Sequence, residues 1–395
     1  MVELLTPDVY VQEVPAGPRP IQAVGTRTAG FIGVAPKADA NRGTATAVNN
    51  WLQFTRVFTE AGSVSTPLSN AVFGFFQNGG SRCFVANIRR GDGVDVGLIA
   101  LALEDEIAMV AAPGYTDVAS YEAILTHCED LKDRVAILDG PLQVEDLGQL
   151  TKVITTVAAR SRAKGAGDTP PDEKPGLRPR VSPGGYGAFY FPGITIRDPL
   201  SGELVDVAPS GHIAGVWARN DASRGVHKAP ANEPIRGALN VTQQLTKDEQ
   251  GVLNPVGVNC IRYFAREGIR IWGARTVADA ANEWRYLNVR RLFNMIEESI
   301  AEATRWIVFE PNDRELWKSI RRDIGAFLTR VWLDGALMGR TASEAFFVKC
   351  DEETNPPEVI DAGMVVAIIG IAPVKPAEFV IFQISQHAGG TEIET

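Results

Sequence analysis

Short apolar runs that end in Gly or Pro recur along the first half of the chain. They occupy residues 29–35, 83–88, 107–114 and 134–140. Runs of this length, rich in β-branched residues, are typical of strands that are covered on both faces of a sheet. Residues 119–133 carry apolar side chains at helical spacing, namely Tyr121, Ile124, Leu125, Cys128 and Leu131. The order strand, helix, strand predicts an α/β unit with a right-handed crossover.

Two long amphipathic helices are predicted in the second half of the chain. The first covers residues 283–307 and is closed by Glu310 and Pro311. Asn312 can cap the second helix, with Glu315 three residues later in a variant of the capping box. The apolar faces comprise Val289, Leu292, Phe293, Ile296, Ile300 and Ala303 in the first helix, and Leu316, Ile320, Ile324, Phe327, Leu328 and Val331 in the second. Each helix must therefore pack against another part of the protein.

Several segments between these elements carry weaker signals. Residues 160–187 hold five prolines, six glycines and many charges, which predicts a mobile surface loop. A strand is expected at 188–196, and the Gly- and Pro-punctuated stretch from there to about residue 255 is expected to be ordered but irregular. Thr341 and Glu344 form a second capping-box pattern, which predicts a short turn of helix.

Both ends of the chain contain a predicted strand with no partner nearby. The first, at 8–14, is enclosed by prolines, and the second, at 378–386, is apolar on both faces. A strand of this kind is unfavourable when it stays unpaired in water. Each strand therefore pairs within its own subunit or adds to the sheet of a neighbouring subunit by β-augmentation. In the second case the inter-subunit strands are formed by Val9, Tyr10, Val11, Gln12, Glu13 and Val14 and by Phe379, Val380, Ile381, Phe382, Gln383 and Ile384.

Length and composition narrow the class of protein. The 395 residues, 45% of them hydrophobic, predict two or three globular domains. A net charge of −9 disfavours a general nucleic-acid binder, which needs a cationic surface. The four cysteines form no CxxC pair, so we expect free buried thiols and synthesis in a reducing cytoplasm. The start shows no secretory signal, and the longest apolar run, 364–374, is too short to cross a membrane as a helix.

The sequence contains none of the common nucleotide-binding, zinc or nucleophile-elbow motifs, which predicts a protein without cofactor, metal site or catalytic activity. A hydrolase could be assembled from Ser210, His212 and Asp221. These residues crowd into one Gly-rich stretch without strand ends to orient them. Polar groups of a loop are the simpler interpretation.

Charge is unevenly distributed along the chain. Residues 261–349 hold 13 Arg and 2 Lys against 12 acidic residues, a net charge of +3 in a chain of net charge −9. Four of these cations fall on one face of the second predicted helix, at Arg314, Lys318, Arg321 and Arg322. This basic stripe is either a solvated face with local ion pairs to Glu315 and Asp323, or a docking face for an acidic partner.

A set of longer stretches occurs in a characteristic order. The chain opens with TPDVYVQEVP, continues with AVFGFFQNGGSRCFVANI and reaches the central stretch SGHIAGVWARNDASRGVHKAPANEPIRG. These are followed by LNPVGVNCIRYFAREGIRIWGARTV, EWRYLNVRRLFNMIEESI, FEPNDRELW, EAFFVKCDEETNPPEVIDAG and APVKPAEFVIFQISQ. The set resembles contractile tail sheath proteins of phage tails and of extracellular contractile injection systems, and the compact length resembles the injection-system sheaths more. The loop at 160–187 matches no motif of that family.

The resemblance implies an α/β fold, α+β overall, in four parts. Residues 1–22 and 376–395 would be arms that exchange strands between subunits. Residues 23–255 would form an outer α/β domain whose topology is similar to subtilisin-like folds, a likeness of fold only. Residues 256–375 would form an inner α/β domain that touches the tube, and the basic stripe would face the tube as well.

The resemblance also implies a structural function. Subunits would stack as six-membered rings in a helical sleeve around an inner tube, and would contract from a metastable extended state to drive the tube through a target envelope. The partners would be further copies of the chain, the inner tube protein, baseplate and tail terminator or cap proteins and a second sheath paralogue, without nucleic acid or membrane insertion. The particle would be assembled in the cytoplasm. The rival classes are a subtilisin-like soluble hydrolase and a monomeric binding module.

Overall fold

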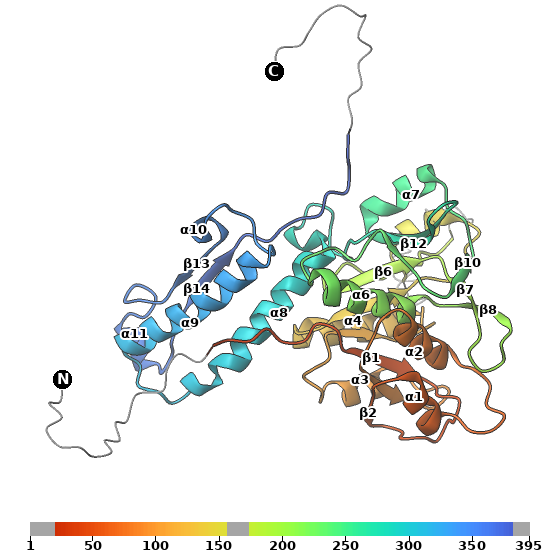
Figure 1. Cartoon of the computed structure of the whole chain (residues 1–395), viewed down its shortest axis with the longest axis horizontal. Coiled ribbons are helices and arrows are strands. Elements are labelled where there is room, and N and C mark those ends of the chain that lie inside the picture. Colours follow the sequence, from red (N-terminus) through yellow and green to blue (C-terminus); the bar gives the residue numbers. More distant parts are fainter. Residues whose placement is uncertain (1–19, 156–173, 382–395) are drawn as a thin grey trace, which may run out of the picture.

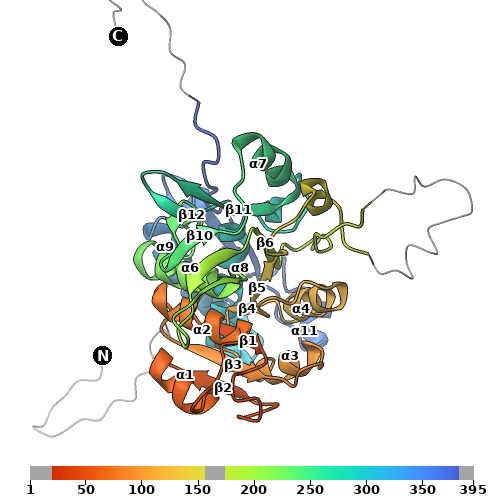
Figure 2. The same cartoon turned by 90° about the vertical axis from the view of Figure 1, so that its right-hand side faces the viewer.

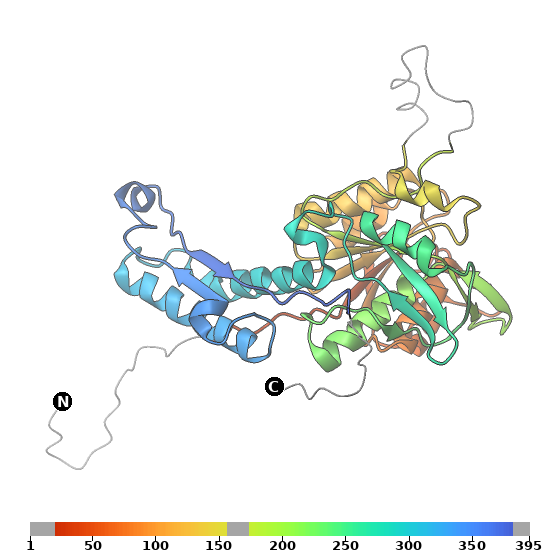
Figure 3. The ribbon, with the colours of Figure 1, turned by 90° about the horizontal axis from the view of Figure 1, so that it is seen from above.

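The computed structural model describes residues 20–155 and 174–381. Figure 1 shows a large body of sheet and helices, from which helix α8 (Leu287–Thr304) extends into a smaller C-terminal part. Seen from above, the two parts lie end to end (Figure 3). The fold is mixed α/β, as the sequence predicts.

The large body is built on a nine-stranded sheet. Its central strands run parallel. After most of these strands the chain crosses back through a helix, so that the next strand starts at the same end of the sheet and runs in the same direction. In spatial order the strands are β2 (Ala45–Val48), β3 (Cys83–Asn87), β1 (Ala29–Gly33), β4 (Met109–Ala111), β5 (Val135–Asp139), β6 (Gly187–Phe191), β11 (Val258–Phe264), β12 (Gly268–Trp272) and β9 (Glu233–Pro234). The four apolar runs predicted as buried strands form β1, β3, β4 and β5, and every residue of these strands is buried.

Helices cover both faces of this sheet (Figure 2). One face carries α1 (Trp51–Phe58), α2 (Pro67–Gln77) and α6 (Ser210–Arg224), and the other carries α3 (Asp95–Leu101), α4 (Val118–Leu131) and α7 (Lys247–Leu253). The predicted helix at 119–133 is α4, and of its predicted apolar face Leu131 alone stays exposed. Two hydrophobic cores therefore lie on opposite sides of one sheet, as in other layered α/β folds.

Residues 188–196, predicted as one strand, form two. β6 ends at Phe191, and β7 (Ile194–Arg197) lies in a separate three-stranded sheet between β10 (Ala238–Val241) and β8 (Leu204–Val207). Pro192 interrupts the run because proline has no amide hydrogen to offer a sheet ladder. The sequence pattern recorded the apolar character of both strands but not the break.

The stretch that was expected to be irregular contains the central helix α6. It shows no amphipathic pattern because it is buried almost all round, with His212, Ile213, Val216 and Trp217 all inaccessible. Its glycines allow a close approach to α2, since a Cβ added at Gly211 would lie 2.3 Å from the backbone of Ala71. The prediction was wrong because burial on every side removes the periodicity on which it depended.

Residues 256–272 also belong to the large body. β11 pairs with β6 in parallel and with β12 antiparallel, so the nine-stranded sheet continues past the expected domain boundary at residue 255. The pairing of β11 with β6 joins residues that are far apart in the sequence, and local patterns do not record such contacts. In the structure the C-terminal part begins at α8.

The second part of the predicted surface loop is held against the sheet body. Arg178 forms a β-bridge with Val153, and Arg180 forms ion pairs of 2.7 Å with both Glu122 and Glu129 of α4. Ion pairs therefore hold residues 174–187 in place. The Pro- and Gly-rich composition, from which a mobile loop was predicted, does not indicate such pairs. Residues 156–173 lie outside the described residues.

The C-terminal part packs α8 and a second long helix against a two-stranded antiparallel sheet. Its elements after α8 are α9 (Arg314–Leu333), α10 (Ala342–Ala345), β13 (Phe346–Lys349), α11 (Pro357–Asp361) and β14 (Ile368–Ile371). Short 3-10 helices lie at Leu147–Thr151, Asn254–Val256, Glu283–Arg285 and Arg305–Ile307. The predicted apolar face of the second helix is buried in full as the core of this part.

Two details of the long predicted helices differ in the structure. The first helix begins at Leu287 after a 3-10 turn at 283–285. The second helix is capped by Asp313, whose carboxylate accepts a 2.9 Å hydrogen bond from the amide of Leu316, while Asn312 accepts one from Trp317 instead. Both residue types are good caps, and here the Asn312 side chain is occupied by the indole of Trp317.

The predicted short turn of helix near residue 344 is α10, but its capping differs from the prediction. The Thr341 hydroxyl shares a 3.1 Å hydrogen bond with the Ser343 hydroxyl and caps no backbone amide, and the Glu344 carboxylate accepts from the amide of Arg340. The capping-box pattern therefore located the turn but not its hydrogen bonds.

Candidate assembly surfaces

Helix α8 joins the two parts of the protein. Its first residue, Leu287, is buried in the core of the sheet body, whereas Leu292 and Ile296 are buried in the C-terminal core. Two turns of one helix thus pass from one hydrophobic core to the other. The polar contacts around this segment determine how the two parts are held together.

A buried ion pair lies at this seam. The Arg291 guanidinium donates to the Asp221 carboxylate at 2.6 Å, and the two side chains are 3% and 2% exposed. Thr26 donates its hydroxyl to the same carboxylate and accepts from Arg291 through its carbonyl. The guanidinium also lies over the ring of Trp217, 4.7 Å from the ring centre. Three segments of the chain therefore meet at one charge pair: the stretch around Thr26, helix α6 and helix α8.

The N-terminal arm has its base on the same seam. Ile21 is buried in the C-terminal core and its carbonyl accepts from Arg330, while the amide of Val24 donates to the hydroxyl of Ser299 at 3.0 Å. Figure 1 shows this described segment, in red, running alongside α8. Residues Val9–Val14, predicted to form the inter-subunit strand, lie outside the described residues.

The C-terminal arm is fastened at Glu378. Its carboxylate accepts two hydrogen bonds from Arg275, at 2.8 and 2.6 Å, and one from the Tyr286 hydroxyl at 3.2 Å. Burial alone would raise the pKa of Glu378, but these bonds outweigh it and hold that pKa below its ordinary value. The carboxylate therefore stays ionised and paired at neutral pH.

Beyond Glu378 the described chain is apolar and open to solvent. Phe379, Val380 and Ile381 are 74%, 70% and 83% exposed, and they belong to no strand. The rest of the predicted strand, Phe382, Gln383 and Ile384, lies outside the described residues. Pairing of this arm with another subunit stays a prediction.

The basic stripe is largely matched by acceptors on its own chain. Lys318 faces Glu315 at 3.8 Å and Arg322 faces Asp323 at 2.9 Å, which are the local pairs considered from the sequence. Arg314 pairs with Glu352 at 2.8 Å, and Arg321 donates to the carbonyl of Cys350. Arg314 and Lys318 stay 80% and 70% exposed, so they remain available to a partner.

Comparison with known proteins shows which family this chain belongs to. The phage tail sheath protein central domain matches residues 102–277, and the phage tail sheath C-terminal domain matches residues 279–387. A chain in the cryo-EM structure of the anti-feeding prophage baseplate is 30% identical to this one. The match covers 98% of this chain and 100% of that one, with a TM-score of 0.75. The chain belongs to the phage tail sheath family.

Other relatives of this tail sheath protein agree in fold and sequence. The sheath of an extracellular contractile injection system, PVC, in its contracted state is 27% identical, with a TM-score of 0.78 over 98% of this chain and 99% of the other. The tail sheath proteins of Vibrio phage KVP40 and Salmonella phage ViI are 32% and 24% identical over 174 and 276 residues. These matches cover 43% and 68% of this chain but only 25% and 42% of the phage proteins.

These matches confirm the resemblance that the motifs indicated. The two family matches meet near residue 278, beyond β12, where the large sheet of this sheath protein is complete. Among the described residues no helix is long and apolar enough to cross a membrane, and no cluster of His, Cys, Asp and Glu has the arrangement of a metal site.

The hydrolase residues of this sheath protein do not form a triad. Ser210 is buried and donates its hydroxyl to Asp139 at 2.6 Å, whereas Asp221 is occupied by Arg291. Both ring nitrogens of His212 are buried without a hydrogen-bond partner within the described chain. Asp139 lies at the end of a predicted strand, but no local pattern identifies it as a site residue or Ser210 as its partner.

The buried groups of this cluster have shifted pKa values. Burial lowers the pKa of His212 to about 4, so the ring is neutral at pH 7. Burial raises the pKa of Asp139 to about 6, although Ser210 and Gly114 donate to its carboxylate and oppose that rise. The shifts follow from packing between α6, α2 and β5, and need no catalytic role.

Replacing His212 by glutamine is expected to flatten the pH dependence of stability. The folded-state pKa of about 4 lies below the ordinary 6.5, so the neutral ring contributes stability that is complete above about pH 6.5. That stability is lost as the pH falls toward 4. Between about pH 6.5 and 5 the wild-type protein should lose about 2 kcal/mol more than the variant. Urea unfolding at both pH values measures the difference, and equal losses would contradict it.

Proposed function

We propose that this tail sheath protein polymerises as six-membered rings stacked in a helical sleeve around an inner tube. The sleeve shortens from a metastable extended state and drives the tube through a target envelope. The observation that carries the proposal is the end-to-end likeness to sheath chains of contractile injection systems, over 98% of this chain for both the anti-feeding prophage and PVC. Those sheaths are described in the contracted state.

The arms link the subunits of this sleeve by strand exchange. Their bases are fixed, through Ile21 and Val24 at one end and through Glu378 at the other. The sheet of β13 and β14 has two strands, so each strand keeps one edge on which a further strand can pair. The exposed apolar residues 379–381 support this role, since pairing in a neighbour's sheet would remove them from water.

Contraction draws its energy from repacking between subunits. The sequence contains none of the common nucleotide-binding motifs, so the extended state is held by a kinetic barrier and is not the state of lowest free energy. Each arm contributes on the order of 1 kcal/mol per backbone hydrogen bond. A few such bonds per arm keep neighbouring subunits tethered while their domains rotate, and the arms persist through contraction.

Further partners follow from the same proposal. The C-terminal part faces the tube, with Arg314, Lys318 and Arg322 of the basic stripe as exposed cations. Baseplate, tail terminator or cap proteins and a second sheath paralogue contact the ends of the sleeve. The protein is a structural component without catalytic activity, made in the cytoplasm as part of a phage tail or tail-like particle. The buried Ser210 supports this, since no substrate reaches its hydroxyl.

Deleting residues 1–14 or residues 377–395 is expected to give folded protein that does not assemble. Either deletion removes a strand that a neighbouring subunit needs. The second also removes Glu378 and leaves Arg275 with the carbonyl of Asn254 as its acceptor, so the folding of that variant needs its own check. Negative-stain microscopy should show tubes or rings for the full chain and dispersed particles for both variants. Circular dichroism provides the check on folding.

A variant with residues 1–14 replaced by Gly and Ser at equal length separates strand pairing from chain length. It should fail to assemble like the deletion, because a Gly-rich segment pairs poorly as a strand. Polymerisation of either deletion variant into tubes of wild-type appearance would refute the role of the arms.

A further inference from the structure

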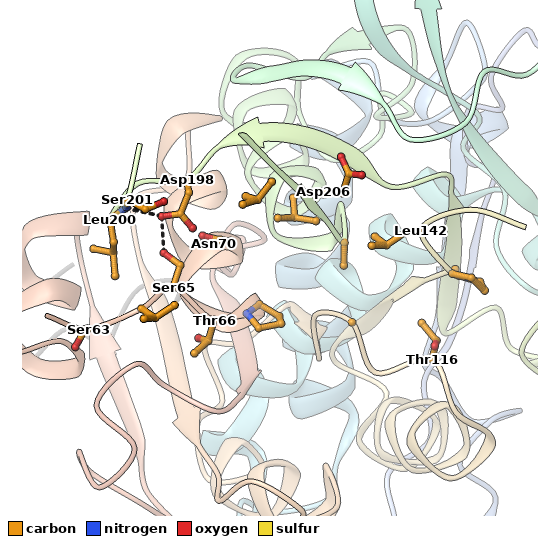
Figure 4. A pocket seen from close by; sticks show the side chains of 18 residues that line it. Ser63, Ser65, Thr66, Asn70, Thr116, Leu142, Asp198, Leu200, Ser201 and Asp206 are labelled. Carbon is orange, nitrogen blue, oxygen red and sulfur yellow. Dashed lines mark hydrogen bonds between the residues drawn. The ribbon is translucent and has the colours of Figure 1, made fainter. Parts of the chain in front are cut away.

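A pocket of the sheet body has no role in the proposed function. It lies at the carboxyl ends of β4 and β5, beside the start of α2 and the hairpin of β7 and β8, and has a volume of about 590 Å³ (Figure 4). This is the size of a small-molecule or side-chain site. The pocket is lined by residues from the segments 63–70, 114–116, 140–142, 198–201 and 205–208.

A buried carboxylate stands in this pocket. Asp198 is 5% exposed, and its Oδ1 accepts three hydrogen bonds of 2.8 Å, from the Ser65 hydroxyl and from the amides of Leu200 and Ser201. Burial alone would raise the pKa of Asp198, but these donors outweigh it and hold that pKa below its ordinary value. Asp198 is therefore an ionised group, and these three donors all bind one of its two oxygens.

No positive charge of the described chain neutralises this carboxylate. The ion pairs formed among residues 20–155 and 174–381 do not include Asp198, and the residues that line the pocket include no Lys, Arg or His. A second carboxylate, Asp206, stands exposed at the rim. Buried charges are normally paired, so an unpaired ionised carboxylate in a pocket indicates a site for a cation.

An unsatisfied amide supports the same assignment. Asn70 lines the pocket, is 7% exposed, and its side-chain oxygen has no hydrogen-bond partner among the described residues. The start of α2 offers little opposing charge, because Pro67 has no amide hydrogen and Thr66 caps the amide of Ser69. The pocket thus presents acceptors and negative charge, and it disfavours phosphate or any other anion.

The walls of the pocket show which kind of cation fits. Apolar side chains line the same pocket, among them Val64, Pro67, Leu142 and Leu200. An inorganic ion would leave these walls in contact with water. A guanidinium or ammonium group on a short hydrocarbon chain matches both features, because the head pairs with the carboxylate and the methylene groups cover the walls.

We propose that this pocket binds an organic cation, a guanidinium or ammonium head on an apolar stem, with Asp198 as its charge partner. The cation is either a free small molecule or an Arg or Lys side chain of a second copy of the chain. The two sources share one chemistry and differ in whether assembly requires the site. The inference does not depend on contraction or on the tube.

Saturation-transfer NMR on the full chain tests the proposal with N-acetyl-argininamide as the probe. The wild-type protein is expected to saturate the probe, and not the uncharged N-acetyl-citrullinamide of nearly the same shape. Asp198→Asn should weaken binding at least fivefold, because it removes the charge while an Oδ1 atom remains to accept from Ser65, Leu200 and Ser201. Asp206→Asn, at the exposed rim, is the matched control and should change binding less.

A second variant covers the case in which Asp198→Asn does not fold. Leu142→Trp fills the pocket without altering its charges and should also abolish binding of the probe. If Asp198→Asn also raises the protein concentration needed for assembly, the natural occupant is a side chain of a second copy. If Asp198→Asn leaves the concentration needed for assembly unchanged, the natural occupant is a free small-molecule cation. Equal binding of both probes, or unchanged binding to the Asp198→Asn and Leu142→Trp variants, would overturn the proposal.

Discussion

Replacing Arg291 by methionine should lower the free energy of unfolding by about 3 to 5 kcal/mol, the cost of leaving a buried charge without its partner. Methionine keeps most of the volume of the side chain over Trp217, so the loss reports the charge. Among residues 20–155 and 174–381, Asp221 would retain the hydroxyl of Thr26 as its side-chain donor. Chemical unfolding of unassembled protein, separated by size exclusion and followed by tryptophan fluorescence, measures the change.

An exposed pair provides the control for this prediction. Arg82 and Glu106 are 39% and 45% exposed at 2.7 Å, and Arg82→Met should cost less than about 1 kcal/mol. The double variant Arg291→Met with Asp221→Leu should recover part of the loss, because neither charge is then buried alone. A cost for Arg291→Met as small as that for Arg82→Met would show that the seam between the two parts does not depend on this ion pair.

Replacing Gly211 by alanine should be the other strongly destabilising change, with a cost of about 1 to 3 kcal/mol or more. The added Cβ would lie 2.3 Å from the Cα atom and the carbonyl oxygen of Ala71. Backbone atoms cannot turn aside as a flexible side chain can, so α6 and α2 must move apart along the most extensive helix contact of the sheet body. The midpoint of urea unfolding measures the effect.

The same substitution in α9 should have the opposite sign. A Cβ added at Gly325 meets no atom within 4 Å, and alanine favours a helix over glycine by up to about 1 kcal/mol. Gly325→Ala is therefore expected to stabilise the C-terminal part. If both variants shift the midpoint in the same direction, close packing of α6 on α2 is not what requires Gly211.

Prediction from the sequence succeeded where one face of an element is buried or where a run is wholly apolar. Leu316, Ile320 and Phe327 of α9 alternate with charged residues, and that contrast identified the helix and its buried face. The same reasoning failed for α6, in which Ser210, Asn220 and His212 are buried beside Ile213. A helix enclosed on all sides contains polar residues that tertiary contacts satisfy or tolerate, so its pattern resembles that of a loop.

The sites were less accessible to sequence reasoning than the elements. Arg314, Lys318, Arg321 and Arg322 were identified as a stripe, but their acceptors include Glu352 and the carbonyl of Cys350, which come from the region of β13. No pattern in the sequence indicated the pocket around Asp198. Ser65 and Asp198 are 133 positions apart, and only the fold brings them within 2.8 Å.

The sequence by itself determined the buried strands β1, β3, β4 and β5, the two long helices of the C-terminal part and the membership of the tail sheath family. These depend on local periodicity and on residue order, which the chain carries before it folds. The tertiary structure alone decided that α6 is a helix, that β11 and β12 complete the large sheet, and that Arg291 meets Asp221 across 70 positions. Those features depend on contacts between distant segments, whose energies are defined only once the segments pack together.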